Sequence, residues 1–168
     1  MLTDLHIIQQ QAADKENEND LFQSFLKEQN AETIDKIVHQ LNKKISTQID
    51  CTTCGNCCKT LMINVTDEEA NNLANKLNQP RKIFDENYLE KSTQLMVINK
   101  MPCHFLHNNI CTVYENRFAG CKEFPALHLP NFIKRLFTVF MHYERCPIIF
   151  NVVEALKQEI YFENKINK

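Results

Sequence analysis

Apolar residues in the first third of the chain recur at helical spacing. Between residues 19 and 48 they fall mostly on one helical face, which predicts one amphipathic helix or two. The preceding residues 1–20 are polar and are expected to be helical or frayed. Core packing explains the apolar stripe, and a partner-binding or dimer helix is the alternative. The stripe consists of Leu21, Phe22, Phe25, Leu26, Ile34, Ile37, Val38, Leu41 and Ile45.

The middle of the chain alternates short apolar segments with capping and turn signals. Thr66-Asp-Glu-Glu69 is a capping box that opens a helix to about Leu77. Asn108-Asn109 can turn a β-hairpin within residues 105–110. The other expected elements are a cysteine-rich loop at 51–58, an extended segment at 61–65, a short helix at 80–90, a strand at 94–99 and a helical turn at 114–120.

Two prolines mark helix starts in the last third of the chain. Proline suits the first turn of a helix, so Pro130 can open a helix to about residue 143. Pro147 can open another to about residue 162. The run Leu136–Met141 is apolar enough to be a buried strand instead.

The pattern as a whole is that of a small helical protein. A chain of 168 residues can bury a core without disulfide staples. We expect a mainly α fold with a few short strands, in a small single domain organised around a cysteine-ligated metal site. Residues 1–48 form a helical N-terminal extension of it, and residues 49–168 form the cysteine-cluster metal-binding domain.

Composition and charge narrow the class of protein. The formal net charge of -2 gives no pull toward nucleic acid, and no run approaches the about 18 apolar residues of a membrane span. The N-terminus lacks the basic and apolar regions of a secretory signal, so we expect a cytoplasmic protein. A reducing compartment favours metal binding over disulfides for the eight cysteines.

Glycine occurs only inside cysteine motifs. The chain has two glycines, Gly55 in Cys54-Gly-Asn-Cys57 and Gly120 before Cys121. Glycine serves where the backbone needs a positive φ or a close approach, so the tight backbone is expected at the cysteines. So few glycines exclude a glycine-dependent cradle for a nucleotide cofactor.

The first cysteine block has the spacing of a metal-binding turn. Cys51, Cys54 and Cys57 follow the C-x2-C-x2-C pattern that wraps a [4Fe–4S] cluster in ferredoxin-type loops. A distant cysteine before proline is a common further ligand there, and Cys146-Pro147 is such a residue. Neighbouring side chains of an extended backbone point to opposite sides, so Cys57 and Cys58 are not expected to serve one ion alike.

The second cysteine block is more widely spaced. Cys103, Cys111 and Cys121 need a hairpin to bring them together, and by spacing alone they could be small buried residues. His104 and His107 beside them are expected to support ligands by hydrogen bonds more than to bind metal. Basic residues that could offset thiolate charge adjoin the blocks: Lys59, Lys100, Arg117, Lys122 and Arg145.

These motifs resemble a known family. The order C-x2-C-x2-C-C, then P-C-x-F-L, C-x-V-Y-x-x-R-x-x-x-C-x-x-F-P and a distant C-P resembles the CxxCxxCC cysteine-cluster family, or YkgJ-type zinc- or iron-chelating family. Phe118 stands where the family usually has proline. The flagellin lysine N-methylases are similar across the cysteine cluster only. The resemblance implies that all eight cysteines bind metal: Cys51, Cys54, Cys57, Cys58, Cys103, Cys111, Cys121 and Cys146.

Three functions remain open at this point. The first is a metal-binding protein that holds an iron–sulfur cluster, with [4Fe–4S] favoured, or zinc. The second is a metal-dependent oxidoreductase or methyltransferase, for which Tyr114, Glu115, Arg117 and Glu123 are the polar candidates. The third is a zinc-stapled protein-interaction module, whose N-terminal helices or Lys134-Arg135 surface would bind an unknown protein partner.

Overall fold

The computed structural model of the protein describes residues 1–162. Contacts divide the chain into two compact units, which we call the helical unit (Met1–Asp50 with the chain from Pro125 on) and the cysteine unit (Cys51–Phe124). The expected mainly α fold with a few short strands is confirmed. The division into 1–48 and 49–168 stays a prediction, because compactness alone does not say which segment folds by itself.

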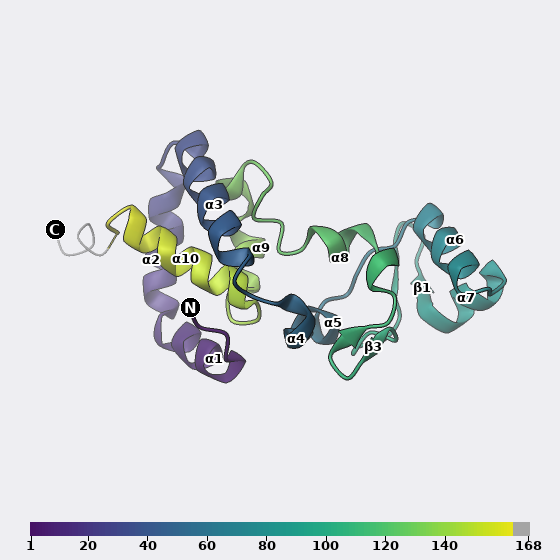
Figure 1. The fold of residues 1–168 in the computed structure, drawn as a ribbon. Coiled ribbons are helices and arrows are strands. Elements are labelled where there is room, and N and C mark those ends of the chain that lie inside the picture. The colour runs from purple at the N-terminus through teal and green to yellow at the C-terminus, as the bar shows by residue number, and fades with distance from the viewer. Residues whose placement is uncertain (163–168) are drawn as a thin grey trace. The chain divides into compact units, whose positions relative to one another are not determined.

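Helices make up the secondary structure of the helical unit within the described residues. Its longest helices, α3 and α10, pack against each other (Figure 1). One helix or two were expected between residues 19 and 48, and the structure has two, which are the main part of α2 and α3. The elements are α1 (Leu5–Asp14), α2 (Glu16–Lys27), α3 (Ala31–Ser46), the 3-10 helix η2 (Phe132–Arg135), α9 (Leu136–Met141) and α10 (Pro147–Glu159).

Side-chain caps explain where several of these helices begin. The Asp4 carboxylate accepts hydrogen bonds from the backbone N–H groups of His6 and Ile7, at 2.9 and 3.2 Å. Asn30 caps α3 by accepting from Thr33 N at 3.0 Å. Pro147 is the first residue of α10, as expected, because its missing N–H is not needed there.

The segment after Pro130 differs from its prediction. A single helix to residue 143 was expected, but the structure has η2 followed by α9, and the alternative of a strand at Leu136–Met141 is wrong. Asn131 adopts a left-handed conformation with φ 60°, which prevents a helix from starting at Pro130. The carboxylate of Asp35 fixes this turn by accepting from Asn131 N and Phe132 N, at 2.7 and 2.8 Å.

A charged network is buried in the helical unit. Lys157 of α10 is 3% exposed, and its ammonium group contacts carboxylate oxygens of Glu18 at 2.7 Å and Glu154 at 2.8 Å. The same group donates to Asn19 Oδ1 at 2.6 Å, and Tyr143 Oη donates to Glu154 at 2.7 Å. Each polar group of this network thus has a partner, which offsets the free-energy cost of removing the charges from water.

The cysteine unit combines short helices with two small hairpins. The loop expected at 51–58 is instead two short helices, and the helix expected at 80–90 ends early because its last residues enter a strand. The elements are α4 (Cys51–Cys54), α5 (Asn56–Thr60), α6 (Asp67–Lys76), α7 (Arg81–Tyr88), β1 (Leu89–Lys91), β2 (Met96–Ile98), β3 (Leu106–His107), β4 (Ile110–Cys111), the 3-10 helix η1 (Tyr114–Asn116) and α8 (Ala119–Glu123).

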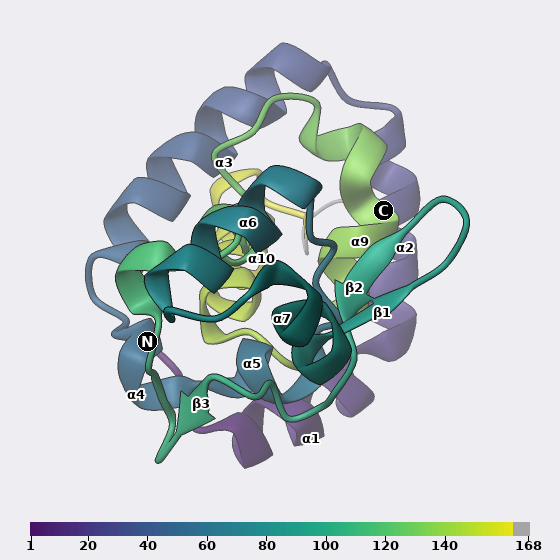
Figure 2. The same cartoon turned by 90° about the vertical axis from the view of Figure 1, so that its right-hand side faces the viewer.

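The predicted capping box begins α6. Glu69 N donates to Thr66 Oγ1 at 3.2 Å, and Thr66 N donates to the Glu69 carboxylate at 2.8 Å. The extended segment before it pairs with β2, since Val65 N donates to Met96 O at 2.8 Å. Strands β1 and β2 form an antiparallel ribbon in which Glu90 lies opposite Val97 (Figure 2).

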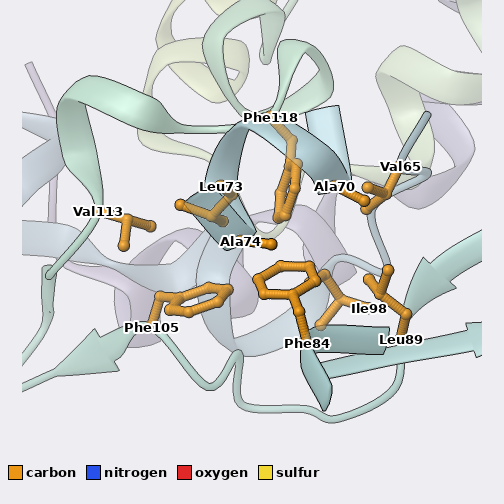
Figure 3. Packing of buried hydrophobic residues seen from close by; sticks show 10 residues of the cluster. All are labelled: Val65, Ala70, Leu73, Ala74, Phe84, Leu89, Ile98, Phe105, Val113 and Phe118. Carbon is orange, nitrogen blue, oxygen red and sulfur yellow. The ribbon is translucent and has the colours of Figure 1, made fainter. Parts of the chain in front are cut away.

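A compact apolar core holds the cysteine unit together. Figure 3 shows the Phe84 ring in the middle of it, with Phe105 on one side and Ile98 on the other. Cys103, Cys111 and Cys121 are partly buried and pack against this core. The core residues are Val65, Ala70, Leu73, Ala74, Phe84, Leu89, Ile98, Phe105, Val113 and Phe118.

None of the helices within residues 1–162 has both the length and the apolar character needed to cross a bilayer.

Candidate metal centre

The first cysteine block forms two short helices that meet at a glycine. Gly55 lies between α4 and α5 with φ 59°, a left-handed conformation that glycine adopts without strain. A Cβ atom at this position would lie 2.9 Å from the backbone oxygen of Asn109. The turn of the β3–β4 hairpin is therefore packed directly against the backbone of the first cysteine block.

Helical geometry changes the expectation for Cys57 and Cys58. They were expected to point to opposite sides of an extended chain, but both lie in α5, and both line the same cavity. Successive side chains of a helix are separated by about 100° rather than 180°. The expected extended backbone is therefore wrong, and the different roles expected for the two thiols toward one ion stay a prediction.

Hydrogen bonds bring the second cysteine block to the first. Cys103 N donates to Cys58 O at 2.8 Å, directly after the cis peptide bond between Met101 and Pro102. Leu106 pairs with Cys111 across the predicted hairpin. Asn108 and Asn109 turn this hairpin with φ of 47° and 65°, values that asparagine tolerates better than most residues.

Cys121 is positioned through helix α8. The Glu69 carboxylate, which caps α6, also accepts a hydrogen bond from Ala119 N in the first turn of α8. Burial opposes ionisation of Glu69, but the hydrogen bonds from Ala119 and Thr66 together lower its pKa below the ordinary glutamate value. One carboxylate thus holds the starts of two helices, and the second of these carries Cys121.

Six cysteines from these segments line one cavity of the cysteine unit. Its volume is about 70 Å³. Much of the remaining wall is apolar, formed by Leu61, Ile63, Ile98, Met101, Phe118 and Phe124. The six cysteines are Cys51, Cys57, Cys58, Cys103, Cys111 and Cys121.

The thiols of this cavity influence one another. The Cys58 thiol donates a hydrogen bond to Cys57, which lowers the pKa of Cys57 to about 6 and raises that of Cys58. Burial, followed by repulsion from Cys103, Cys57 and Cys111, raises the pKa of Cys121 to about 12. Burial also raises the pKa of Cys103. A cation placed among these thiols would stabilise their ionised form, because its charge offsets the repulsion between the thiolates.

Arg117 is the charged side chain of the cavity wall. Of the residues described, no other charged residue lines the cavity. Its guanidinium carbon lies 3.6 Å from the centre of the Tyr114 ring, and its Nε donates to Tyr114 O at 2.9 Å. Of the enzyme candidates from the sequence, Tyr114 and Arg117 line the cavity, whereas Glu115 and Glu123 do not.

The remaining candidates lie elsewhere. Cys54 ends α4 and is not part of the cavity wall, and Cys146 lies in the helical unit, where it is buried before α10. His104 is outside the wall, with Nε2 2.6 Å from Asn99 Oδ1 and its ring edge-on to Tyr88. His107 is also outside the wall and is exposed.

The donor atoms of the cavity suit a soft metal. Cysteine thiolates are the preferred ligands of zinc and of iron–sulfur clusters. Throughout residues 1–162, no three His, Cys, Asp or Glu side chains are arranged so that they could hold a metal ion as they stand. The eight cysteines therefore stay predicted ligands, and the fit rests on the chemistry of the donor set.

Sequence reasoning missed how the site is assembled. The apolar wall, the contact of Asn109 with Gly55 and the bond from Ala119 to Glu69 join residues far apart in the sequence. Arg117 was one of five basic residues beside cysteines. The spacing Tyr114-x-x-Arg117 could have distinguished Arg117 from the other four, because this spacing places a cation next to an aromatic ring in a helical turn.

Comparisons with known proteins agree with this donor set. No curated protein and no solved structure matches the chain in these comparisons. A family model, CxxCxxCC, described as a putative zinc- or iron-chelating domain, matches residues 50–147 and so covers more than half of the 168 residues. The match includes every cysteine of the chain, and the chain belongs to the CxxCxxCC family of zinc- or iron-chelating domains.

Proposed function

We propose that this protein holds an iron–sulfur cluster through the cysteines of the cysteine unit. The observation that carries the proposal is the cavity, whose wall collects six cysteines from distant segments of Cys51–Phe124. The C-x2-C-x2-C spacing of Cys51, Cys54 and Cys57 favours a cluster over a single zinc ion.

The size of the cavity supports a centre with more than one metal atom. A space for a single water needs about 10–15 Å³, and the cavity offers about 70 Å³. A zinc ion bound by four thiolates at about 2.3 Å would leave cysteines of the wall without a metal. An iron–sulfur cluster also takes four cysteine ligands, so the volume of the cavity, and not the number of its cysteines, favours the larger centre.

The proposed ligands fall into two groups. Cys51, Cys57, Cys58, Cys103, Cys111 and Cys121 are proposed because they line the cavity. Cys54 is proposed because of its motif spacing and because it lies within the family match at residues 50–147, while Cys146 of the helical unit stays the ligand that the sequence predicted. A bound cluster would supply electron transfer or a structural cross-link. The apolar wall, including Phe118 and Phe124, would exclude water from it.

Elemental analysis tests the proposal directly. The full chain is purified anaerobically without a metal-chelating tag, and iron, acid-labile sulfide and zinc are measured beside the visible spectrum. We expect iron and sulfide in comparable amounts and a brown protein. Stoichiometric zinc without colour would overturn the cluster, and the absence of both metals would overturn metal binding.

Variants connect the metal to the cavity. We expect Cys121→Ser and Cys103→Ser to reduce the bound metal to less than half of the wild-type amount, because each removes a thiolate from the wall. Thr60→Ser is the matched control, since it lies just after α5's cysteines, keeps its hydroxyl and is absent from the wall. Equal metal contents in all four proteins would show that the metal binds elsewhere.

A further inference from the structure

Arg117 and Tyr114 form a pair on the wall of the cavity. The guanidinium is stacked on the ring at 3.6 Å, and a hydrogen bond of 2.9 Å from Nε to Tyr114 O fixes it from a second direction. Arg117 is half-buried, and no ion pair with a carboxylate is formed by it within residues 1–162. Its positive charge is therefore not neutralised by a protein carboxylate.

The other basic residues near the cysteines do not share this position. Lys59, Lys100 and Lys122 adjoin cysteines in the sequence, but none of them lines the cavity. Lys100 and Lys122 are exposed, and solvent screens exposed charges more strongly than a charge on the cavity wall. Sequence proximity to cysteines therefore does not give these lysines the role that the cavity gives Arg117.

A thiolate centre needs such a cation. Four thiolates around a divalent ion leave an excess negative charge, and an apolar wall lowers the local dielectric constant, so that the excess is poorly screened. A cation on the wall stabilises the loaded centre relative to the empty one. Charge near a cluster also changes its reduction potential.

We propose that Arg117 is the charge-balancing residue of the metal centre and that Tyr114 is the positioning residue that holds its guanidinium at the cavity. This inference rests on the proposed function, because it assigns a role toward the metal held there. The affinity of the site for metal then depends on the Arg117 guanidinium, a cation outside the ligand set. The reduction potential of a bound cluster depends on the same cation.

Two substitutions at Arg117 separate charge from structure. Arg117→Gln and Arg117→Lys both lose the stacked guanidinium and its Nε hydrogen bond, but only Arg117→Lys keeps the positive charge. We expect Arg117→Gln to bind metal about tenfold more weakly in competition with a chelator, and Arg117→Lys to recover most of this loss. A purely structural role predicts equal losses in the two variants.

Matched substitutions test the pair and the position. Tyr114→Leu removes the ring under the Arg117 guanidinium and is expected to weaken binding severalfold, whereas Tyr114→Phe keeps the ring and is expected to weaken binding less. Lys100→Gln removes one exposed positive charge three residues before Cys103 and is expected to have no effect.

The same proteins are measured with zinc and with iron, and the potential is measured where a cluster is bound. Loss of the cation destabilises the more negative, reduced state more than the oxidised state. If the loss for the reduced state is tenfold larger, the potential of Arg117→Gln falls by about 59 mV. Three results would overturn the inference while leaving metal binding intact. They are an unchanged metal affinity in Arg117→Gln, equal losses of affinity in Arg117→Gln and Arg117→Lys, and a loss in Lys100→Gln as large as that in Arg117→Gln. A wild-type protein that binds neither metal would overturn the proposed function and this inference with it.

Discussion

Replacement of Gly55 by alanine is the sharpest structural test of how the centre is assembled. Gly55 has φ 59° and lies between the two helices of the first cysteine block. The added Cβ would lie 2.9 Å from Asn109 O, 3.2 Å from Asn109 Cα and 3.3 Å from Asn109 Cβ. Two of these three atoms are backbone, so a side-chain rotation cannot relieve the contact.

The expected cost has two parts. A left-handed conformation costs a residue with a Cβ about 1–2 kcal/mol. Relief of a close contact by backbone movement costs about 1–3 kcal/mol more. Gly55→Ala should therefore lower the free energy of unfolding by about 2–5 kcal/mol, a large fraction of the about 5–15 kcal/mol of a typical domain.

Gly120→Ala is the matched control, because it changes the other glycine of a cysteine motif. Its added Cβ would meet Ile63 at an ordinary contact of 3.5 Å. Alanine is favoured over glycine in helices by about 0.5–1 kcal/mol, so this variant should be as stable as the wild type or slightly more stable. The assay is urea unfolding of the full chain followed by circular dichroism. Equal midpoints for the two variants would refute the argument from Asn109.

Other parts of the chain give three further predictions. Thr66→Ala removes the capping box of α6 and should cost about 1 kcal/mol in urea unfolding; an unchanged midpoint would contradict the cap. Lys157→Met leaves the carboxylates of Glu18 and Glu154 without their buried partner and should cost about 3–5 kcal/mol, part of which Glu154→Leu should restore in the double variant. The pKa of Glu154 is lowered, because the hydrogen bonds from Lys15, Lys157 and Tyr143 outweigh the effect of its burial. The Glu154 carboxylate therefore stabilises the fold above its unfolded pKa of about 4.3, and this stabilisation is lost as the pH falls through the lower folded pKa. The difference in stability between the wild type and Glu154→Gln should therefore shrink in acid, and a difference independent of pH would be contrary to this coupling.

Local signals predicted the elements that local chemistry controls. The capping box at Thr66, the turn at Asn108-Asn109 and the helix start at Pro147 were each expected from a few neighbouring residues, and each is present. In all three, the interaction that decides the conformation lies within four residues of chain, so the sequence contains it directly.

The errors fall where distant residues decide. The strand at Leu89–Lys91 was expected as the end of a helix, because its pairing with β2 depends on residues beyond the next turn. The first cysteine block was expected as a loop, although its two-residue gaps also fit single helical turns. The donor set of eight cysteines stays a prediction. The sequence did not show which basic residue lines the cavity, because Arg117 is held there by its contact with the Tyr114 ring.

The cavity also has a consequence for the order of folding. Its lining cysteines extend from Cys51 to Cys121, so its wall is closed by contacts between segments up to 70 residues apart. Closing a long loop costs more chain entropy than forming a local turn. Contacts between distant segments therefore form late. Cys51, Cys57 and Cys58 can come together early, within the short helices α4 and α5, while Cys121 joins them only when α8 has docked through Glu69. A newly made chain would thus present a partial thiol cluster first and complete it last, so a metal ion captured early would become fully ligated only by the folded chain.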